Sequence, residues 1–476
     1  MRYPGFVGPS YTLANRIAAY DQCFNWFPSK VESGTGSADY VLEPAPGYRT
    51  WCTLAETPTR GFFTLNGASF GVGGENLYQL PSALGGSATL RASGLSNVNG
   101  QLVTMAGNGD SGFQIMIQSD STLYCFDVLT DTLTTITDVP SSSGVVFQDG
   151  YFISLDADTS TIYLSALSDG TSWDPLDIAQ RNDSPDKWVA ILARPKEIWL
   201  FGSQTTSVYY NDGVSTPPYV PNPSVAIAYG TPAPASPALI GAAPIWLAND
   251  LAVRMANGYT PQRVSTHAVE YAISQYATVS DADGFAYEDQ GHQFYVLNFP
   301  TANATWVYDK TTGLWHQRGT WNGLSFDVSP VWGYTFGYNT HLVGDRTSGK
   351  VYDMTQDVST DTDGTTGLRR VRRAPHLVNE LVRVVYHELQ LFMEVGLGLS
   401  SGQGSDPQIM LRWSNDGGQT FGNVHATGAG ATGQFNTRVT WHRLGQARDR
   451  VFEVSVSDPI PWRIVDAFVT ATAGIS

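Results

Sequence analysis

Two glycine-rich stretches match motifs of catalytic or cofactor-binding sites. Residues 67–71 read Gly-Ala-Ser-Phe-Gly, the G-x-S-x-G pattern of a nucleophile elbow. That serine must sit on a turn between a strand and a helix, but Val72-Gly73-Gly74 follows and does not begin a helix. Residues 428–433 match G-x-G-x-x-G, yet the sequence after them predicts a strand rather than the helix that receives a dinucleotide. We therefore expect no catalytic serine and no bound cofactor.

The acidic and histidine residues do not form a metal site in the sequence. Asp281 and Asp283, and likewise Asp361 and Asp363, precede a glycine and look like fragments of calcium loops. Neither fragment supplies the remaining oxygen ligands or the glutamate at the twelfth position of an EF-hand loop. The eight histidines are scattered, and none has metal-ligand spacing to another histidine or to a cysteine. We expect no metal site, no catalytic residue and no enzyme activity.

One turn has a sharper pattern than any of these. Ser414, Asp416, Gly418, Thr420 and Phe421 match the Asp-box, S-x-D-x-G-x-T-[FW], which occurs in sialidases and other propellers. In that motif the polar side chains satisfy the backbone of a hairpin and the aromatic ring packs beneath it, so its role is structural. A glycosidase would also need two facing carboxylates, which the sequence does not pair.

The elements between these motifs read as short strands. Gly and Pro are plentiful (48 and 26 residues), while charged residues make up only 15% of the 476. An apolar strand, a turn and a strand that ends in an aromatic residue recur loosely between residues 60 and 357, at a blade-sized spacing. Asn66-Gly67 and Asp149-Gly150 predict two-residue hairpins. We expect an all-β chain with a β-propeller-like body, and a pair of β-sandwiches is the alternative.

Changes in composition divide the chain into three parts. Residues 1–50, with isolated aromatics between Pro and Gly, predict an N-terminal arm or strands that pack on the body or on a neighbour. Residues 51–357 form the propeller-like body, with a proline-rich insertion near 216–244. A polar stretch at 355–370 marks a boundary, and residues 370–476 form a C-terminal, sandwich-like β domain. Within it, residues 377–392 predict a strand in preference to a helix.

The net charge limits the classes of partner that the chain can bind. A formal charge of −16 repels phosphate backbones, so general DNA binding is not expected. The acidity either keeps the protein soluble or lines a channel through which DNA slides. Three distant cysteines suggest reduced, buried thiols. No signal-peptide pattern opens the chain and no apolar stretch could span a bilayer, so we expect a soluble product made in the cytoplasm.

Two groups of residues are candidates for interfaces. The rings of Phe6, Trp26 and Phe27 need a surface against which to bury, in the same subunit or in a neighbour. Arginines gather late in the chain, and Arg369, Arg370, Arg372 and Arg373 form the densest group. Guanidinium groups suit carboxylate partners, so this group predicts a docking patch for an acidic neighbour. Scattered solvated charge with local ion pairs is the alternative.

The order of motifs along the whole chain resembles one protein family. Its members are the packaged-DNA stabilisation proteins, also called tail nozzles or hubs, of short-tailed bacteriophages. The segments that carry the resemblance are Gly5–Ser10, Cys23–Pro28, Pro44–Tyr48, Ser414–Phe421 and Trp441–Arg450.

The resemblance implies a structural virion protein at the unique vertex, below the portal and adaptor. Such proteins form a ring, of six copies by expectation, that extends the DNA channel, retains packaged DNA and allows its ejection. They hold a tail needle or plug and offer surfaces to tailspikes or fibres, while genomic DNA passes without sequence-specific binding. The alternative function, suggested by the Asp-box, is a carbohydrate-binding or sialidase-like β-propeller.

Overall fold

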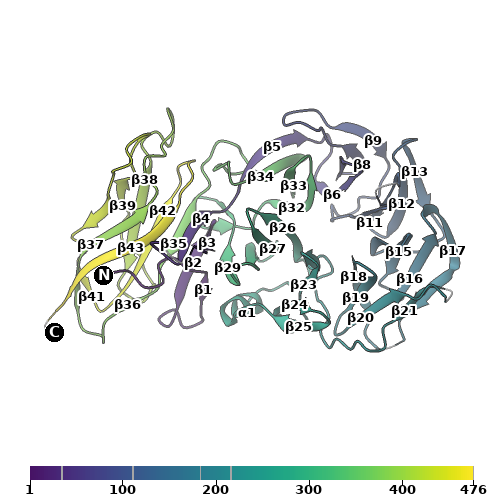
Figure 1. The fold of residues 1–476 in the computed structure, drawn as a ribbon, viewed down its shortest axis with the longest axis horizontal. Coiled ribbons are helices and arrows are strands. Elements are labelled where there is room, and N and C mark those ends of the chain that lie inside the picture. The colour runs from purple at the N-terminus through teal and green to yellow at the C-terminus, as the bar shows by residue number, and fades with distance from the viewer. Residues whose placement is uncertain (34–35, 110–111, 183, 215–216, 475–476) are drawn as a thin grey trace.

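The computed structural model describes residues 1–33, 36–109, 112–182, 184–214 and 217–474. It is built almost wholly of strands, and α1 (His267–Ser274) is the one helix in these ranges. Two bodies lie side by side, a ring of sheets and a smaller two-sheet unit that contains the C-terminus (Figure 1). The expectation of an all-β chain with a propeller and a C-terminal sandwich is therefore confirmed.

The ring consists of seven four-stranded antiparallel units, or blades. Blade one comprises β6 (Thr59–Leu65), β7 (Ala68–Gly73), β8 (Asn76–Gln79) and β9 (Thr89–Ser93). Blade two comprises β10 (Thr104–Gly107), β11 (Gln114–Ser119), β12 (Thr122–Asp127) and β13 (Thr132–Ile136). Blade three comprises β14 (Gly144–Gln148), β15 (Tyr151–Asp156), β16 (Thr161–Ala166) and β17 (Asp169–Gln180). Blade four comprises β18 (Trp188–Arg194), β19 (Glu197–Gly202), β20 (Thr206–Asn211) and β21 (Tyr219–Pro221).

The remaining blades complete the circle. Blade five comprises β22 (Ala238–Ile240), β23 (Ala243–Leu247), β24 (Val253–Asn257) and β25 (Thr260–Arg263). Blade six comprises β26 (Asp283–Asp289), β27 (His292–Phe299), β28 (Ala304–Asp309) and β29 (Leu314–Gln317). Blade seven comprises β32 (Val331–Gly337), β33 (Thr340–Asp345), β34 (Lys350–Thr355) and β5 (Gly47–Thr53). First strands of successive blades contact one another, as β6 contacts both β10 and β32, so they lie innermost.

Blade seven joins distant parts of the sequence. Its fourth strand, β5, comes from the N-terminal region and pairs antiparallel with β34, where Val351 faces Cys52. This strand closes the ring, because it supplies the last ladder from a segment that precedes blade one. The boundary predicted at residue 50 falls inside β5.

Hairpin turns within the blades have the chemistry that the sequence indicates. Asn66 and Gly67 have φ of 50° and 75°, and Asp149 and Gly150 have φ of 48° and 85°. Both central positions of each turn are thus left-handed, as a two-residue hairpin with native strand twist requires. The two predicted hairpins are confirmed.

Large aromatic residues fill the spaces between blades. Between blades four and five, the ring of Trp246 lies 6.2 Å from that of Trp199 and 5.3 Å from that of Phe201. All three side chains are fully buried. Each blade therefore buries both faces against its neighbours, and this burial is the main stabilising term for the ring.

The proline-rich segment is a connection between blades. Residue 216, where the predicted insertion begins, lies outside the described residues, but Tyr219–Pro221 completes blade four and Ala238–Ile240 opens blade five. Between them, Thr231, Ala233 and Ser236 are fully buried. The segment is therefore packed against the body and does not project as an insertion, because its prolines end strands without preventing burial.

The second body is a sandwich of two sheets. One sheet contains β2 (Tyr20–Phe24), β35 (Arg370–Arg373), β42 (Asp449–Val456), β38 (Gln408–Ser414) and β39 (His425–Gly428), with β1 (Tyr11–Thr12) and β36 (Leu377–Val378) beside it. The other contains β3 (Trp26–Lys30), β4 (Tyr40–Pro44), β43 (Ile464–Ala473), β37 (Val384–Met393) and β40 (Val439–His442), with β41 (Gln446–Ala447). Leu389 and Leu391 from one sheet share a core with Leu411 and Val454 from the other. The strand predicted within residues 377–392 is confirmed as β37.

The N-terminal segment interlaces the two bodies. In β2, Phe24 pairs in parallel with Gln317 of blade six, while Cys23 pairs antiparallel with Arg372 of the sandwich. One strand thus makes a continuous sheet of a blade and a sandwich layer. A small hairpin, β30 (Thr320–Trp321) and β31 (Phe326–Asp327), lies at the same junction, where the ring of Phe326 stacks on that of Phe24 at 4.2 Å.

The Phe27 side chain holds the N-terminal arm against the propeller. Its side chain is 1% exposed, and its ring meets that of Phe294 edge to face at 5.1 Å. We expect Phe27→Ala to lower the free energy of unfolding by about 3–5 kcal/mol, since it removes a fully buried ring and leaves a cavity. Urea titration followed by tryptophan fluorescence measures this loss.

Phe392→Ala is the matched control, because Phe392 is 47% exposed on the outer sandwich face. That variant should change the free energy of unfolding by no more than about 0.5 kcal/mol. Equal losses of unfolding free energy in the two variants would contradict the role of Phe27 in holding the arm against the propeller.

Candidate functional site

The predicted arm anchors bury within their own chain. Phe6 is 1% exposed and its ring lies 5.6 Å from that of Tyr3, in the sandwich core. Trp26 is fully buried, and its indole N–H donates to the Trp462 carbonyl oxygen at 2.8 Å. With Phe27 in the propeller core, the three rings bind the arm to both bodies of the same subunit.

Arg372 holds the first part of the arm in place. It is 1% exposed and donates to four main-chain carbonyl oxygens, those of Phe6 at 2.5 Å, Gly5 at 2.8 Å, Pro9 at 2.9 Å and Gln22 at 3.2 Å. Of these acceptors, Phe6 is buried, Pro9 and Gln22 are half-buried and Gly5 is exposed, and the guanidinium gives each carbonyl oxygen a donor. The planar guanidinium fork can reach several of them at once. We name this arrangement the Arg372 clamp.

The neighbouring arginines are also engaged inside the chain. Arg373 donates to Glu453 through Nε at 2.9 Å and Nη2 at 2.6 Å, and Arg412 donates to the other oxygen of Glu453. Arg370 is fully buried, and burial lowers its pKa to about 9. Arg369 is half-buried, with its guanidinium 4.4 Å from the centre of the Trp321 ring.

These positions correct the expectation of a surface docking patch. Arg370, Arg372 and Arg373 are at most 7% exposed in the single chain. The physical reason is that β35 lies between β2 and β42, so its side chains point into packed layers and find carbonyl or carboxylate partners there. A contact with a neighbouring molecule stays a prediction only for the half-exposed Arg369.

A buried polar cluster lies where Phe27 enters the propeller. His316 is fully buried, and neither of its ring nitrogens has a hydrogen-bond partner. Its ring lies 5.8 Å from that of Phe27 and 5.9 Å from that of Phe294. Burial, with the nearby positive charge of Arg318 and the His292 ring, holds the pKa of His316 well below its usual value.

The groups next to His316 are better satisfied. The Nδ1 atom of His292 lies 2.8 Å from Asp309 Oδ2, and its Nε2 atom lies 3.1 Å from Ser29 Oγ. Arg318 donates to the Tyr287 hydroxyl at 2.5 Å. The sequence does not reveal this cluster, since its histidines are 24 residues apart and only the blade and the arm bring them against Phe27.

The Asp-box-like turn satisfies its own backbone. The Ser414 hydroxyl accepts from the Gly418 N–H at 2.9 Å, and Asp416 accepts from the Thr420 N–H and hydroxyl at 2.9 and 2.6 Å. These hydrogen bonds lower the pKa of Asp416. The half-buried Phe421 ring lies 4.8 Å from the Arg373 guanidinium and 4.9 Å from that of Arg412. The turn therefore packs onto the arginine–Glu453 network.

The other sequence motifs have structural positions. Ser69 is fully buried in β7, and its hydroxyl bonds to that of Thr64. Asp283 is 4% exposed and accepts from Arg346 at 2.6 Å. Within the described ranges, no three His, Cys, Asp or Glu side chains are grouped as metal ligands. In the same ranges, no helix is both long and apolar enough to cross a bilayer.

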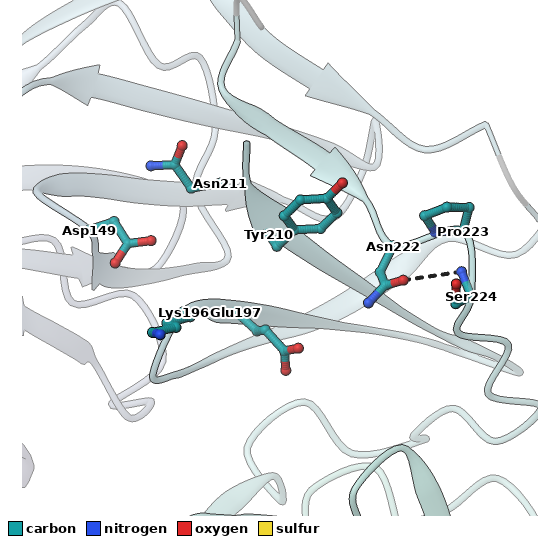
Figure 2. Close-up of a pocket in the computed structure, with 8 residues that line it drawn as sticks. All are labelled: Asp149, Lys196, Glu197, Tyr210, Asn211, Asn222, Pro223 and Ser224. Atoms are coloured by element: carbon teal, nitrogen blue, oxygen red, sulfur yellow. Dashed lines mark hydrogen bonds between the residues drawn. The ribbon is translucent and has the colours of Figure 1, made fainter. Parts of the chain in front are cut away.

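A hollow lies at the rim of blade four (Figure 2). It has a volume of about 670 Å³ and is open to solvent. Its lining comes from two hairpins, the end of β20 and the loop after β21, and consists of Asp149, Lys196, Glu197, Tyr210, Asn211, Asn222, Pro223 and Ser224. We name it the blade-four hollow; it was not anticipated from the sequence.

A second hollow, of about 430 Å³, lies near the ends of the inner strands of blades five, six and seven. It is lined mainly by apolar and aromatic side chains, among them Ile240, Tyr287, Tyr334 and Phe336. The ring of Tyr334 stacks on that of Phe285 at 5.6 Å.

Comparison with known families identifies both bodies. A family model described as the β-propeller of bacteriophage P22 Gp10 matches residues 24–359. A second model, described as the β-sandwich of the same protein, matches residues 369–472. No curated protein matches the chain in a sequence search.

Three solved structures have low similarity to the chain. BamB from Moraxella catarrhalis is 9% identical over 69% of this chain and 96% of its own, with a TM-score of 0.40. PorZ of Porphyromonas gingivalis is 10% identical over 72% of this chain and 45% of its own, with a TM-score of 0.39. BBS1N, solved in complex with ARL6DN, is 10% identical over 65% and 97%, with a TM-score of 0.41. At these scores the likenesses carry no functional argument.

The Arg372 clamp predicts that the arm depends on a guanidinium fork. Arg372→Lys keeps the positive charge, but an ammonium group cannot reach four carbonyl oxygens, so some of these acceptors, which lie beside a buried side chain, lose their partners. We expect the free energy of unfolding to fall by about 3 kcal/mol and limited proteolysis to release the first 30 residues faster. Arg438→Lys, at an exposed position, is the control and should leave both readouts unchanged. Wild-type protection of the arm in Arg372→Lys would refute the clamp.

His316 predicts a pH dependence of stability. Because its pKa in the folded protein lies below the unfolded value near 6.5, the unfolded chain takes up the proton first on acidification. His316 therefore lowers stability as pH falls below about 6.5, by up to about 1 kcal/mol between pH 6.5 and 5.5. In His316→Leu this contribution should disappear, which urea titrations of both proteins at the two pH values would show. Parallel losses in the two proteins would argue against it.

Proposed function

The chain belongs to the bacteriophage P22 Gp10 family, whose two models match its propeller and its sandwich, and we propose that it is a ring-forming subunit of a phage tail nozzle. As a family member it is a structural phage protein and a component of the virion tail. The match over both bodies is the observation that carries the proposal. The proposed location is the unique vertex of the virion, with synthesis in the host cytoplasm.

In this proposal the ring extends the DNA channel below the portal and adaptor, retains packaged DNA and allows its ejection. The net negative charge of the chain supports a role as a conduit for DNA. Six copies with a net charge of −16 each would place roughly −96 around one axis. A channel of that sign repels the phosphate backbone, so DNA passes without adhering and without sequence-specific binding.

The mechanical requirement of a nozzle also fits the fold. A subunit in the wall of a channel must transmit load between its parts without hinging. Here β2 is hydrogen-bonded to blade six on one side and to the sandwich on the other, so one sheet spans both bodies. Asn25 adds to this junction, since its side-chain amide donates to the carbonyl oxygens of Gly319 at 2.8 Å and Arg369 at 2.7 Å.

The proposed partners are those of a tail assembly. Copies of the same chain would close a ring, of six copies by proposal, through a repeated heterologous interface. The adaptor would bind at the portal-proximal end, and a needle or plug and tailspikes or fibres would bind elsewhere. The family points to a non-enzymatic role. Of the alternative function, carbohydrate binding without hydrolysis is favoured by one observation, the polar lining of the blade-four hollow.

The proposal predicts the mass of the native assembly. A ring of six copies of this 51.6 kDa chain has a mass of about 310 kDa. Native mass spectrometry of the recombinant protein, alone and with isolated adaptor–portal complexes, should detect that species in at least the second sample. A monomer under both conditions, with no incorporation into tails, would refute the nozzle assignment.

A further inference from the structure

The blade-four hollow combines an exposed aromatic ring with polar groups. Tyr210 is 37% exposed and lies directly across the β19–β20 ladder from Glu197, on the same face of the blade. Figure 2 shows Tyr210 between Asn211 on one side and Asn222 on the other. A volume of about 670 Å³ is within the range of small-molecule sites. Such a hollow offers one apolar surface surrounded by hydrogen-bonding groups.

The polar groups include both donors and acceptors. Asp149 and Glu197 accept, Lys196 donates, and the Asn211 and Asn222 amides do both. The Asn222 Oδ1 atom accepts from the Ser224 N–H at 3.1 Å, and its side chain also hydrogen-bonds with Tyr259, so one N–H of its NH2 group remains as a donor. A ligand that matches this lining must carry alternating donors and acceptors at close spacing, as the hydroxyl groups of a sugar do.

A network behind the hollow fixes the position of Glu197. Its Oε1 atom accepts from the Tyr259 hydroxyl, and its Oε2 atom lies 3.3 Å from Arg194 Nε. The Tyr259 ring in turn stacks on the buried Trp199 ring at 6.3 Å. The Oε2 atom is buried, so a ligand would meet this carboxylate at the remaining acceptor position of Oε1. The side chain is therefore held in place before a ligand arrives, which reduces the entropic cost of binding.

Charge restricts the class of ligand. The lining has two carboxylates and one ammonium group, so it repels phosphate, sulfate and carboxylate groups. Two carboxylates do not make a metal centre, and among the described residues no set of three metal-ligating side chains occurs. An uncharged ligand rich in hydroxyl groups suits the lining, with the face of the Tyr210 ring against its C–H groups.

We propose that the blade-four hollow binds a neutral oligosaccharide, with Tyr210 as the stacking platform and Asp149, Glu197 and Asn222 as hydroxyl partners. The binding is non-covalent and involves no hydrolysis. This property goes beyond the proposed nozzle function, because it gives the outer rim of the subunit a contact with glycans. It does not depend on ring formation.

The experiment uses the full chain and a panel of neutral hexose and N-acetylhexosamine oligosaccharides, with sialylated and phosphorylated glycans as the charged arm. Saturation-transfer NMR detects weak binding, and titration gives the affinity. We expect binding to members of the neutral arm only. Tyr210→Ala should weaken it about tenfold, which corresponds to the loss of one stacking contact.

Two further variants separate binding from folding. Tyr210→Phe keeps the ring and should retain most of the affinity. Tyr271→Ala removes a tyrosine of similar exposure, 41%, from helix α1 and should bind as the wild type does. Absence of binding to every neutral glycan, preference for the charged arm, or equal affinity of Tyr210→Ala and wild type would each overturn the proposal. None of these results bears on the mass of the ring, so the two proposals fail separately.

Discussion

The propeller and the sandwich are held together by β2 and by the Arg372 clamp, which binds the chain on either side of β1. Residues 5–10 precede β1 with few regular hydrogen bonds of their own, so their carbonyl groups need donors from elsewhere in the chain. Arg372 donates to the carbonyl oxygens of Gly5, Phe6, Pro9 and Gln22. Because the segment is fixed, β2 can pair with blade six and with β35 at the same time.

The same segment couples the closure of both bodies. β5 completes blade seven from the N-terminal side, and the Met1 amine donates to the Val469 carbonyl oxygen at 2.7 Å in the sandwich. Neither body is complete until residues more than 300 positions apart have met, which makes the contacts highly non-local. The strand that closes the propeller, β5, and the strand that joins it to the sandwich, β2, thus belong to the same N-terminal segment.

The local turns could be predicted from the sequence, but the hydrogen bonds between residues far apart in the sequence could not. Hairpins such as Asn66-Gly67 follow from positive φ at two adjacent positions, and the propeller follows from their recurrence. The blade count was hidden because the seventh blade is split between Gly47–Thr53 and residues 331–355. The burial of Arg372 could not be predicted from the sequence for a related reason. A run of arginines looks solvated until the chain brings carbonyl oxygens from 350 positions away.

Burial of charge leaves the surface as acidic as the composition suggests. The buried arginines are offset by a similar number of buried carboxylates, including Asp283, Asp309 and Glu453, within the described residues. Most of the net charge of −16 therefore faces solvent. Such a surface disfavours the adhesion of polyanions, DNA among them, both in its hollows and along the proposed channel. An uncharged ligand rich in hydroxyl groups is not repelled in this way. One acidic surface can therefore have low adhesion to DNA and still bind a neutral glycan.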